Sequence, residues 1–313
     1  MAINILMRNA LKALSYPDIQ LKKNYKLARK MTDLTHFHLL RPFYTMWDHV
    51  VACGDHNVPV RIFSPDKAGM EEEHPVLLFF HGGGWVIGNI NSYSKVCANM
   101  ARITDHIVVS VDYRLAPEYR FPAAPEDCYQ VAREILLDDE LFHVPADQVT
   151  LIGDSAGANL AAAVSLMARD RGEFLPKKQI LIYPATFNDH TDSSPFDSVR
   201  QNGTDYLLTS KRICDYMELY MSGPQDLQNS YFAPLLADDL SNQPRTMIIT
   251  AEYDPLRDEG EEYGFRLREC GNDVEIHRIP DALHGFFSLP PTFSQVRDCY
   301  EMINRFLNEV PMP

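Results

Sequence analysis

Two short glycine-rich segments hold residues whose types and spacing suit acyl-transfer chemistry. Residues 81–85 read HGGGW, and residues 153–157 read GDSAG. Each segment follows an apolar run typical of a buried strand, and the second leads into a small apolar stretch typical of a helix. A strand–turn–helix setting of this kind holds a serine hydroxyl out on a sharp turn in front of the helix N-terminus. The sequence therefore predicts that Ser155 is a nucleophile.

The sequence near this serine also predicts backbone N–H groups that could bind a negatively charged oxygen. Gly82, Gly83 and Gly84 present N–H groups with no side chain in the way. The N–H of Ala156 directly follows the candidate nucleophile. Groups of this kind can donate to the oxyanion that develops when an acyl carbonyl is attacked. We expect an oxyanion hole made by Ala156 and the glycine run, with Gly83 and Gly84 as the favoured donors.

A serine nucleophile needs a base beside it and an acid that orients the base. After a turn of this type the acid follows along the chain and the histidine comes last. Asp254 lies in the turn at 252–255 that follows an expected strand at 246–250, and it precedes Pro255, which biases it to an extended conformation. Glu252 and Asp258 are the rival acids, but Asp258 falls within an expected helix, where it suits the N-terminal dipole. Asp254 is therefore the predicted acid.

The predicted base is His284, which lies after the last expected strand, at 274–279. The following Gly285 gives the loop the freedom to bring the imidazole over the sheet edge. The other histidines fall too early in the chain or, like His277, inside a strand pattern. We expect His284 to take the proton of the nucleophile while the acid holds the imidazole tautomer.

Other residues near these motifs have structural interpretations. We expect His81 to orient the glycine run and Asp154 to make hydrogen bonds that brace the turn. Trp85, Phe286 and Phe287 are candidate walls of a substrate pocket, although aromatic residues beside apolar strands are as typical of a core.

The pattern along the chain predicts an α/β fold with a mostly parallel eight-stranded sheet flanked by helices. Apolar runs alternate with helical stretches, which is typical of a parallel sheet covered on both faces. A short polar turn between the first two strands indicates an antiparallel start. We expect strands at 46–53, 59–63, 75–80, 107–111, 149–152, 179–183, 246–250 and 274–279, and helices at 92–103, 122–137, 156–169, 257–270 and 293–308.

Two segments interrupt this alternation. Residues 1–45 are basic and amphipathic, and residues 185–245 contain a polar loop and one helical pattern, at 211–221. A connection this long between strands is typical of a lid. We expect both segments to form a helical cap over an α/β core made of 46–184 and 246–313. The alternative is that 1–45 packs elsewhere as an ordinary flank.

Composition narrows the classes of partner. The net charge of −14 over 313 residues argues against nucleic acid and anionic membranes, which both need basic patches. The sequence has no run near the roughly 18 apolar residues of a membrane span and no signal-peptide pattern. The six cysteines are scattered without a Cys-x-x-Cys pair, which suits reduced thiols and a cytoplasmic location. With no ligand-spaced histidine or cysteine cluster, we expect no metal and no cofactor.

The combined motifs resemble the hormone-sensitive-lipase-like branch (family IV) of bacterial esterases, within the α/β-hydrolase fold. The resemblance rests on HGGGW at 81–85, DYRLAPE at 112–118, GDSAG at 153–157, DPLRDEG at 254–260 and HGF at 284–286. It implies a cofactor-free carboxylesterase that acts on small acyl esters of short to medium chain length and hydrolyses them with water. Members of the branch often pair through the last strand and helix, which leaves a homodimer open.

Other functions share these motifs. A deacetylase of acylated sugars, an amidase or a peptidase would use the same three side chains. A non-catalytic receptor for small molecules on this fold would lack the histidine, and His284 is present.

Overall fold

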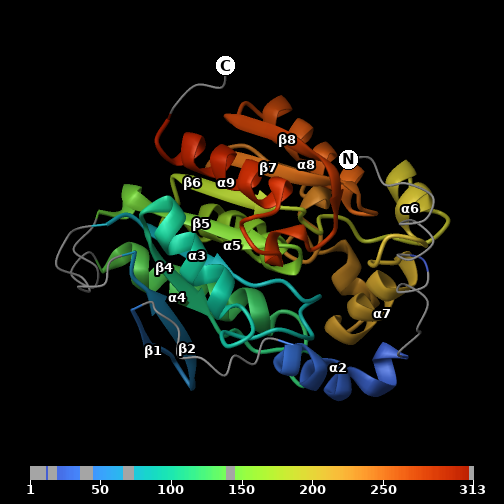
Figure 1. The fold of residues 1–313 in the computed structure, drawn as a ribbon, viewed down its shortest axis with the longest axis horizontal. Coiled ribbons are helices and arrows are strands. Elements are labelled where there is room, and N and C mark those ends of the chain that lie inside the picture. The colour runs from blue at the N-terminus through green and yellow to red at the C-terminus, as the bar shows by residue number, and fades with distance from the viewer. Residues whose placement is uncertain (1–11, 13–19, 36–44, 66–73, 139–144, 310–313) are drawn as a thin grey trace.

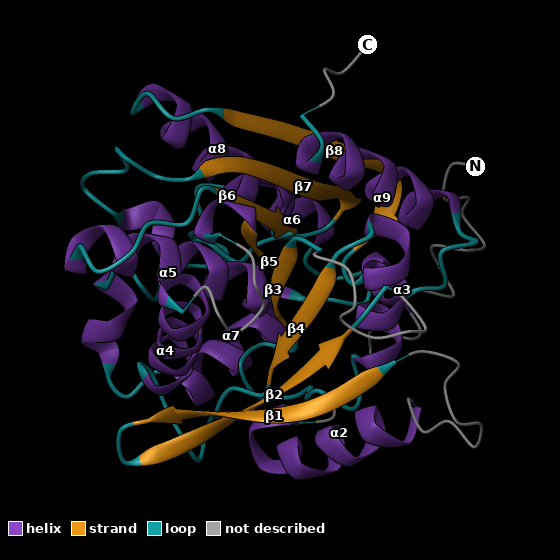
Figure 2. Ribbon diagram, turned by 90° about the vertical axis from the view of Figure 1, so that its left-hand side faces the viewer, coloured by secondary structure: helices purple, strands orange, loops and turns teal. Residues whose placement is uncertain are grey.

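The computed structural model describes residues 12, 20–35, 45–65, 74–138 and 145–309. Most of the expected N-terminal cap segment therefore lies outside the described residues. The described chain forms three layers, with one mixed sheet between two layers of helices (Figures 1 and 2). None of the described helices is long and apolar enough to cross a membrane.

The central sheet has eight strands in the order β1-β2-β4-β3-β5-β6-β7-β8. The pairs β1–β2 and β2–β4 are antiparallel, and every later pair is parallel. This confirms the mostly parallel sheet with an antiparallel start. The strands are β1 (Met46–Cys53), β2 (His56–Phe63), β3 (Val76–Phe80), β4 (Ile107–Val111), β5 (Val149–Asp154), β6 (Lys178–Ile182), β7 (Arg245–Tyr253) and β8 (Val274–Leu283).

Helices cover both faces of this sheet. Buried apolar side chains of α4, α5 and α8 pack with one face, and those of α3 and α9 pack with the other. Because both faces are covered, the central strands β3, β4 and β5 are buried along their whole length. The helices are α2 (Leu21–Thr35), α3 (Ser94–Thr104), α4 (Ala123–Leu137), α5 (Ala156–Arg171), α6 (Asp197–Asn202), α7 (Ser210–Tyr220), α8 (Arg257–Glu269) and α9 (Ser294–Leu307).

Four parallel strands end where the chemistry-bearing motifs begin. His81 follows β3, Ser155 follows β5, Asp254 follows β7 and His284 follows β8. Since the carboxyl ends of parallel strands meet at one edge of a sheet, these side chains come to the same edge. The topology thus gathers residues that are up to about 200 positions apart in the sequence.

Helices from the two interrupting segments lie side by side. The helix α2 packs against α7, as both views show (Figures 1 and 2). The ammonium of Lys22 pairs with two acids of α7, at 3.4 Å from Asp215 and also with Glu218. The guanidinium of Arg29 donates to the backbone oxygens of Val86, at 2.6 Å, and Ala116, at 2.7 Å. These contacts tie α2 to α7 and to the loops that follow β3 and β4.

Candidate active site

The turn that carries Ser155 is backbone-strained in the way a nucleophile turn requires. Ser155 has φ 54° and ψ −120° between β5 and α5. A Cβ at Gly157 would lie 1.9 Å from the backbone oxygen of Phe80, and one at Gly153 would lie 2.3 Å from the oxygen of Gly157. Only glycine lets the turn come this close to itself and to β3. A non-glycine residue at positive φ costs about 1–3 kcal/mol, and the surrounding sheet and helix hold it there.

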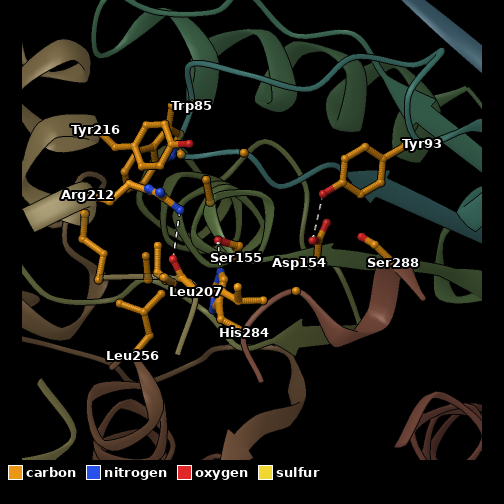
Figure 3. Close-up of a pocket in the computed structure, with 17 residues that line it drawn as sticks. Trp85, Tyr93, Asp154, Ser155, Leu207, Arg212, Tyr216, Leu256, His284 and Ser288 are labelled. Atoms are coloured by element: carbon orange, nitrogen blue, oxygen red, sulfur yellow. Dashed lines mark hydrogen bonds between the residues drawn. The ribbon is translucent and has the colours of Figure 1, made fainter. Parts of the chain in front are cut away.

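Three side chains form a hydrogen-bonded chain that ends at this hydroxyl (Figure 3). His284 Nε2 lies 2.9 Å from Ser155 Oγ, and His284 Nδ1 lies 2.7 Å from Asp254 Oδ2. Asp254 is fully buried, and its second oxygen accepts the backbone N–H of Leu256 at 2.9 Å. An ionised carboxylate accepts only, so His284 Nδ1 donates and Nε2 faces the hydroxyl as an acceptor. The order and positions of the three residues are those expected from the sequence.

The two rival acids have other partners. The carboxylate of Glu252 accepts the backbone N–H of Asp281 at 2.7 Å. The carboxylate of Asp258 accepts the N–H of Ser198 at 2.7 Å and pairs with Arg257 at 2.8 Å. Neither is hydrogen-bonded to the histidine.

The N–H groups near the nucleophile divide into two kinds. The N–H of Gly82 donates to Asp154 Oδ1 at 2.8 Å, and Gly82 does not line the cavity described below. The expectation that Gly82 belongs to the oxyanion hole is therefore wrong, because this donor is already used inside the fold. Gly83, Gly84 and Ala156 do line the cavity, and within the described part of the chain no group accepts their N–H.

Asp154 joins the nucleophile turn to the glycine run. Its carboxylate accepts from Gly82, from the hydroxyl of Tyr93 at 3.0 Å and, at 3.4 Å, from that of Tyr183. Burial raises the pKa of Asp154 to about 6, against the lowering effect of these donors. The contacts match the bracing role expected for Asp154.

His81 is enclosed under the glycine run. Its Nδ1 donates to the backbone oxygen of Gly82 at 2.8 Å, and its ring stacks on Tyr113 with centroids 4.3 Å apart. The Tyr113 hydroxyl donates to the backbone oxygen of His81 at 2.7 Å. Burial lowers the pKa of His81 to about 4, so the ring is neutral near pH 7. His81 therefore orients the loop and lies outside the hydrogen-bonded chain of Ser155.

A cavity of about 250 Å³ opens beside Ser155 and His284. The expected wall residue Trp85 lines this cavity, and its ring stacks on Tyr220 with centroids 4.5 Å apart. Six of the lining residues come from the segment between β6 and β7. The lining residues are Gly83, Gly84, Trp85, Tyr93, Asp154, Ser155, Ala156, Ala185, Leu207, Leu208, Arg212, Ile213, Tyr216, Leu256, His284, Gly285 and Ser288.

Two expected wall residues do not line this cavity. Phe286 packs edge-on against Tyr183, at 5.4 Å between centroids, and Phe287 packs against Tyr300 at 5.1 Å. Both are buried in the apolar cluster between the sheet and α3 and α9. The expectation that Phe286 and Phe287 form pocket walls is therefore wrong. The turn after Gly285, which has φ 83°, directs both rings inward, away from the cavity.

Sequence reasoning missed the wall residues of α7. Arg212, Ile213 and Tyr216 of this helix line the cavity, and Tyr216 is the i+4 neighbour of Arg212 and the i+3 neighbour of Ile213. The helical pattern at 211–221 was visible, but the pattern alone does not say which face meets the cavity. We found no metal-binding group of His, Cys, Asp or Glu in the described ranges.

Comparisons with known proteins show the family to which the chain belongs. A family model for the alpha/beta hydrolase fold matches residues 77–288, more than half of the chain. The chain therefore belongs to the α/β-hydrolase family, in its hormone-sensitive-lipase-like branch. An arylesterase from Saccharolobus solfataricus is 36% identical over 80% of this chain and 79% of that protein. An arylacetamide deacetylase from Rattus norvegicus is 31% identical over 80% of this chain and 77% of that protein.

A solved structure extends the similarity over nearly the whole chain. A hyperthermophilic esterase from the archaeon Pyrobaculum calidifontis superimposes with a TM-score of 0.87 at 35% identity, covering 99% of each chain. Since several relatives, the arylesterase among them, are named as ester hydrolases, the chain is an ester hydrolase of this family.

Proposed function

We propose that this protein is a serine carboxylesterase that hydrolyses short- to medium-chain acyl esters through a covalent acyl-enzyme. The observation that carries the proposal is the hydrogen-bonded chain from Ser155 through His284 to Asp254, which ends in an apolar-walled cavity. Nothing in this mechanism calls on a metal or a cofactor.

Each group has one role in the first half of the reaction. Ser155 Oγ attacks the acyl carbon while its proton passes to His284 Nε2. The oxyanion accepts hydrogen bonds from the N–H groups of Ala156, Gly83 and Gly84, which have no other acceptor in the described chain. The tetrahedral intermediate then collapses, and His284 returns the proton to the leaving alkoxide. The acyl group remains on Ser155 as an ester.

Water completes the cycle by the same route in reverse. His284 takes a proton from a water molecule, whose oxygen attacks the acyl carbon of the Ser155 ester. The second tetrahedral intermediate breaks its bond to Ser155 Oγ, which regains its proton from His284. The products are a carboxylic acid and the free enzyme.

The walls of the cavity support the limit on acyl length. Leu207, Leu208, Ile213 and Leu256 face the space beside Ser155 and bound it at about 250 Å³. These apolar walls stabilise a bound alkyl or aryl group, because burial of apolar surface contributes roughly 25 cal/mol per Å². A bounded space of this kind suits short to medium acyl chains.

We further propose that residues 1–45 and 185–245 together form a cap over this site. The helix α7 supplies part of the cavity wall, and α2 packs on α7 and holds the loop after β3 through Arg29. The cap would then set which substrates reach Ser155.

Amide hydrolysis is the second candidate function. One relative is named as an arylacetamide deacetylase, and the same three side chains can act on amides and esters. The two functions differ in the leaving group, an amine or an alkoxide, which must be protonated by His284.

A ladder of 4-nitrophenyl esters from acetate to palmitate, run beside an aryl acetamide, tests both candidates. We expect a rate maximum at about four to eight acyl carbons that vanishes in Ser155→Ala, with slower turnover of the acetamide. Turnover of the acetamide alone would select the amidase. No turnover of any ester by the folded protein would reject the carboxylesterase.

A further inference from the structure

The cavity is lined by leucine and isoleucine side chains, and one cationic side chain, that of Arg212, also enters it. Arg212 lies in the first turn of α7 and lines the cavity together with Ser155 and His284. Figure 3 shows its side chain directed inward, toward the side of the cavity on which Ser155 lies. A purely apolar acyl pocket has no use for a guanidinium, which is costly to remove from water.

The guanidinium has no counter-ion within the described part of the chain. One N–H group donates to the backbone oxygen of Leu207 at 2.9 Å, and no described carboxylate lies within ion-pair distance. The acid three residues along the same helix, Asp215, pairs with Lys211 at 2.8 Å and with Lys22 at 3.4 Å. The acids beside the nucleophile are also engaged, since Asp154 accepts from Gly82.

Tyr216 adds a neutral donor one helical turn further along the same face. It lines the same cavity, and its hydroxyl has no hydrogen-bond partner among the described residues. Burial raises the pKa of Tyr216 to about 12, against the opposing effect of the Arg212 charge, so the hydroxyl keeps its proton. Arg212 and Tyr216 therefore present several unused donors to one side of the cavity.

These donors match the chemistry of a carboxylate. A guanidinium has five N–H donors in a planar fork, and two of them can meet both oxygens of one carboxylate. The protein carries a net charge of −14, so its long-range field repels anions and gives no help in binding them. Attraction of an anionic substrate would have to come from a local cation such as Arg212.

We propose that Arg212, assisted by Tyr216, binds a carboxylate carried by the substrate, so that the preferred esters have a free carboxylate on the acyl or the alcohol portion. This inference rests on the proposed esterase function and names its substrate class. Arg212 is a specificity-determining residue, because it contacts a part of the substrate away from the bond that is cleaved.

Two pairs of substrates test the proposal and locate the charge. In the acyl pair, the mono-4-nitrophenyl ester of adipic acid is compared with 4-nitrophenyl hexanoate, which has the same number of acyl carbons. In the alcohol pair, 4-acetoxybenzoate is compared with its methyl ester. The measure is the ratio of kcat/KM for the charged ester to that for the neutral ester. A general loss of folded protein leaves this ratio unchanged.

We expect Arg212→Met to lower this ratio by about tenfold or more in one of the two pairs, mainly through KM for the charged ester. Arg212→Lys keeps the charge without the fork and should retain part of the preference. Lys211→Met is the matched control, since it removes a positive charge from the same helix outside the cavity. Added salt should lower the wild-type ratio, because it screens the attraction.

The opposite results would overturn the proposal. If Arg212→Met leaves the ratio of kcat/KM values unchanged in both pairs, Arg212 is a structural residue that holds the turn at Leu207. This conclusion would hold even if the variant protein had a lower melting temperature. In that case the wild-type protein still hydrolyses the neutral esters and the esterase function stands. If the wild-type protein hydrolyses none of the four esters, the esterase function fails together with this inference.

Discussion

The acid of the hydrogen-bonded chain is fixed through both of its oxygens. Asp254 Oδ2 meets His284, and Asp254 Oδ1 accepts the N–H of Leu256. A fully buried carboxylate held in this way cannot rotate away from the imidazole. The ring therefore keeps its proton on Nδ1, and Nε2 stays directed at Ser155 as an acceptor.

Ser155→Ala and His284→Ala should each lower kcat/KM for a 4-nitrophenyl ester by about ten-thousand-fold or more. Ser155→Ala removes the nucleophile and His284→Ala removes the base, and neither substitution opens the apolar core. The double variant should be no slower than the slower single variant, because the residues act as one unit. Steady-state kinetics with circular dichroism of each variant checks this, and additive losses would count against the proposed triad.

Asp154→Asn should change how stability depends on pH. Burial raises the folded-state pKa of Asp154 to about 6, above its ordinary value of 3.8. As the pH falls from 7 to 4, the folded protein takes up this proton first, which contributes stability of the order of 3 kcal/mol. The contribution is complete below the unfolded pKa and is lost as the pH rises through the folded one.

The asparagine variant lacks this proton and cannot gain that stability. Between pH 7 and pH 4 it should therefore lose more free energy of unfolding than the wild-type protein, as measured by urea titration at each pH. Parallel curves for the two proteins would show that Asp154 does not titrate in this window. His81 acts in the opposite direction in both proteins, since burial lowers its pKa to about 4, and it cancels in the comparison.

At the level of single residues, the structure brings together the three side chains for which chemistry and chain order gave the same prediction. The nucleophile turn, the acid after a strand and the histidine beside a glycine narrow the choice to Ser155, Asp254 and His284. Gly82 was misplaced because the sequence does not show that Asp154 takes its N–H. Arg212 was missed because an isolated arginine on an amphipathic helix is usually exposed to water.

Among the secondary-structure elements, the helix α2 holds the loop after β3 in place through Arg29. Arg29→Ala should lower the free energy of unfolding by about 1–3 kcal/mol, because it leaves two backbone oxygens, of Val86 and Ala116, without their donor. Ester turnover should also fall, since this loop continues from Gly83 and Gly84. Lys30→Ala, one exposed residue further along α2, is the matched control for thermal melting and kinetics.

Equal stability and activity of Arg29→Ala and Lys30→Ala would show that α2 does not position the loop. The salt bridge to Glu118, at 2.8 Å, is partly exposed and should contribute little to the difference.

Helices and strands with a clear pattern of apolar residues were predictable from the sequence, whereas the residues at which they end were less predictable. The continuous apolar run of β3 and the small-residue stretch of α5 fall where they were expected, within a few residues. The strand β8 continues to Leu283, past the predicted end at residue 279. It stays paired with β7 as far as Leu283, the residue before His284. The short helix α6 was not predicted, since six residues give fewer than two turns of periodicity.

Over the whole molecule, the sheet gathers the chemistry, and the segment between β6 and β7 contributes part of the cavity wall. The parallel strands bring Ser155, Asp254 and His284 to one edge, and this follows from strand order and direction. The wall depends instead on how α7 lies, and α7 lies against α2 from the other end of the sequence. The meeting of these side chains was therefore predictable from motifs, whereas the position of α7 depends on a long-range packing that no local pattern encodes.

Removal of residues 1–40, which include α2, should leave the sheet folded and change the range of esters that is hydrolysed. The truncation takes away the partner of α7 and the clamp of Arg29, while the strands and their covering helices remain. We expect a cooperative melting transition at a lower temperature and a broader acyl-length profile, or a loss of ester turnover. A shorter deletion of residues 1–11, which keeps α2, is the control and should resemble the full chain. Unchanged kinetics after the longer deletion would mean that the N-terminal segment is a flank and not part of the cap.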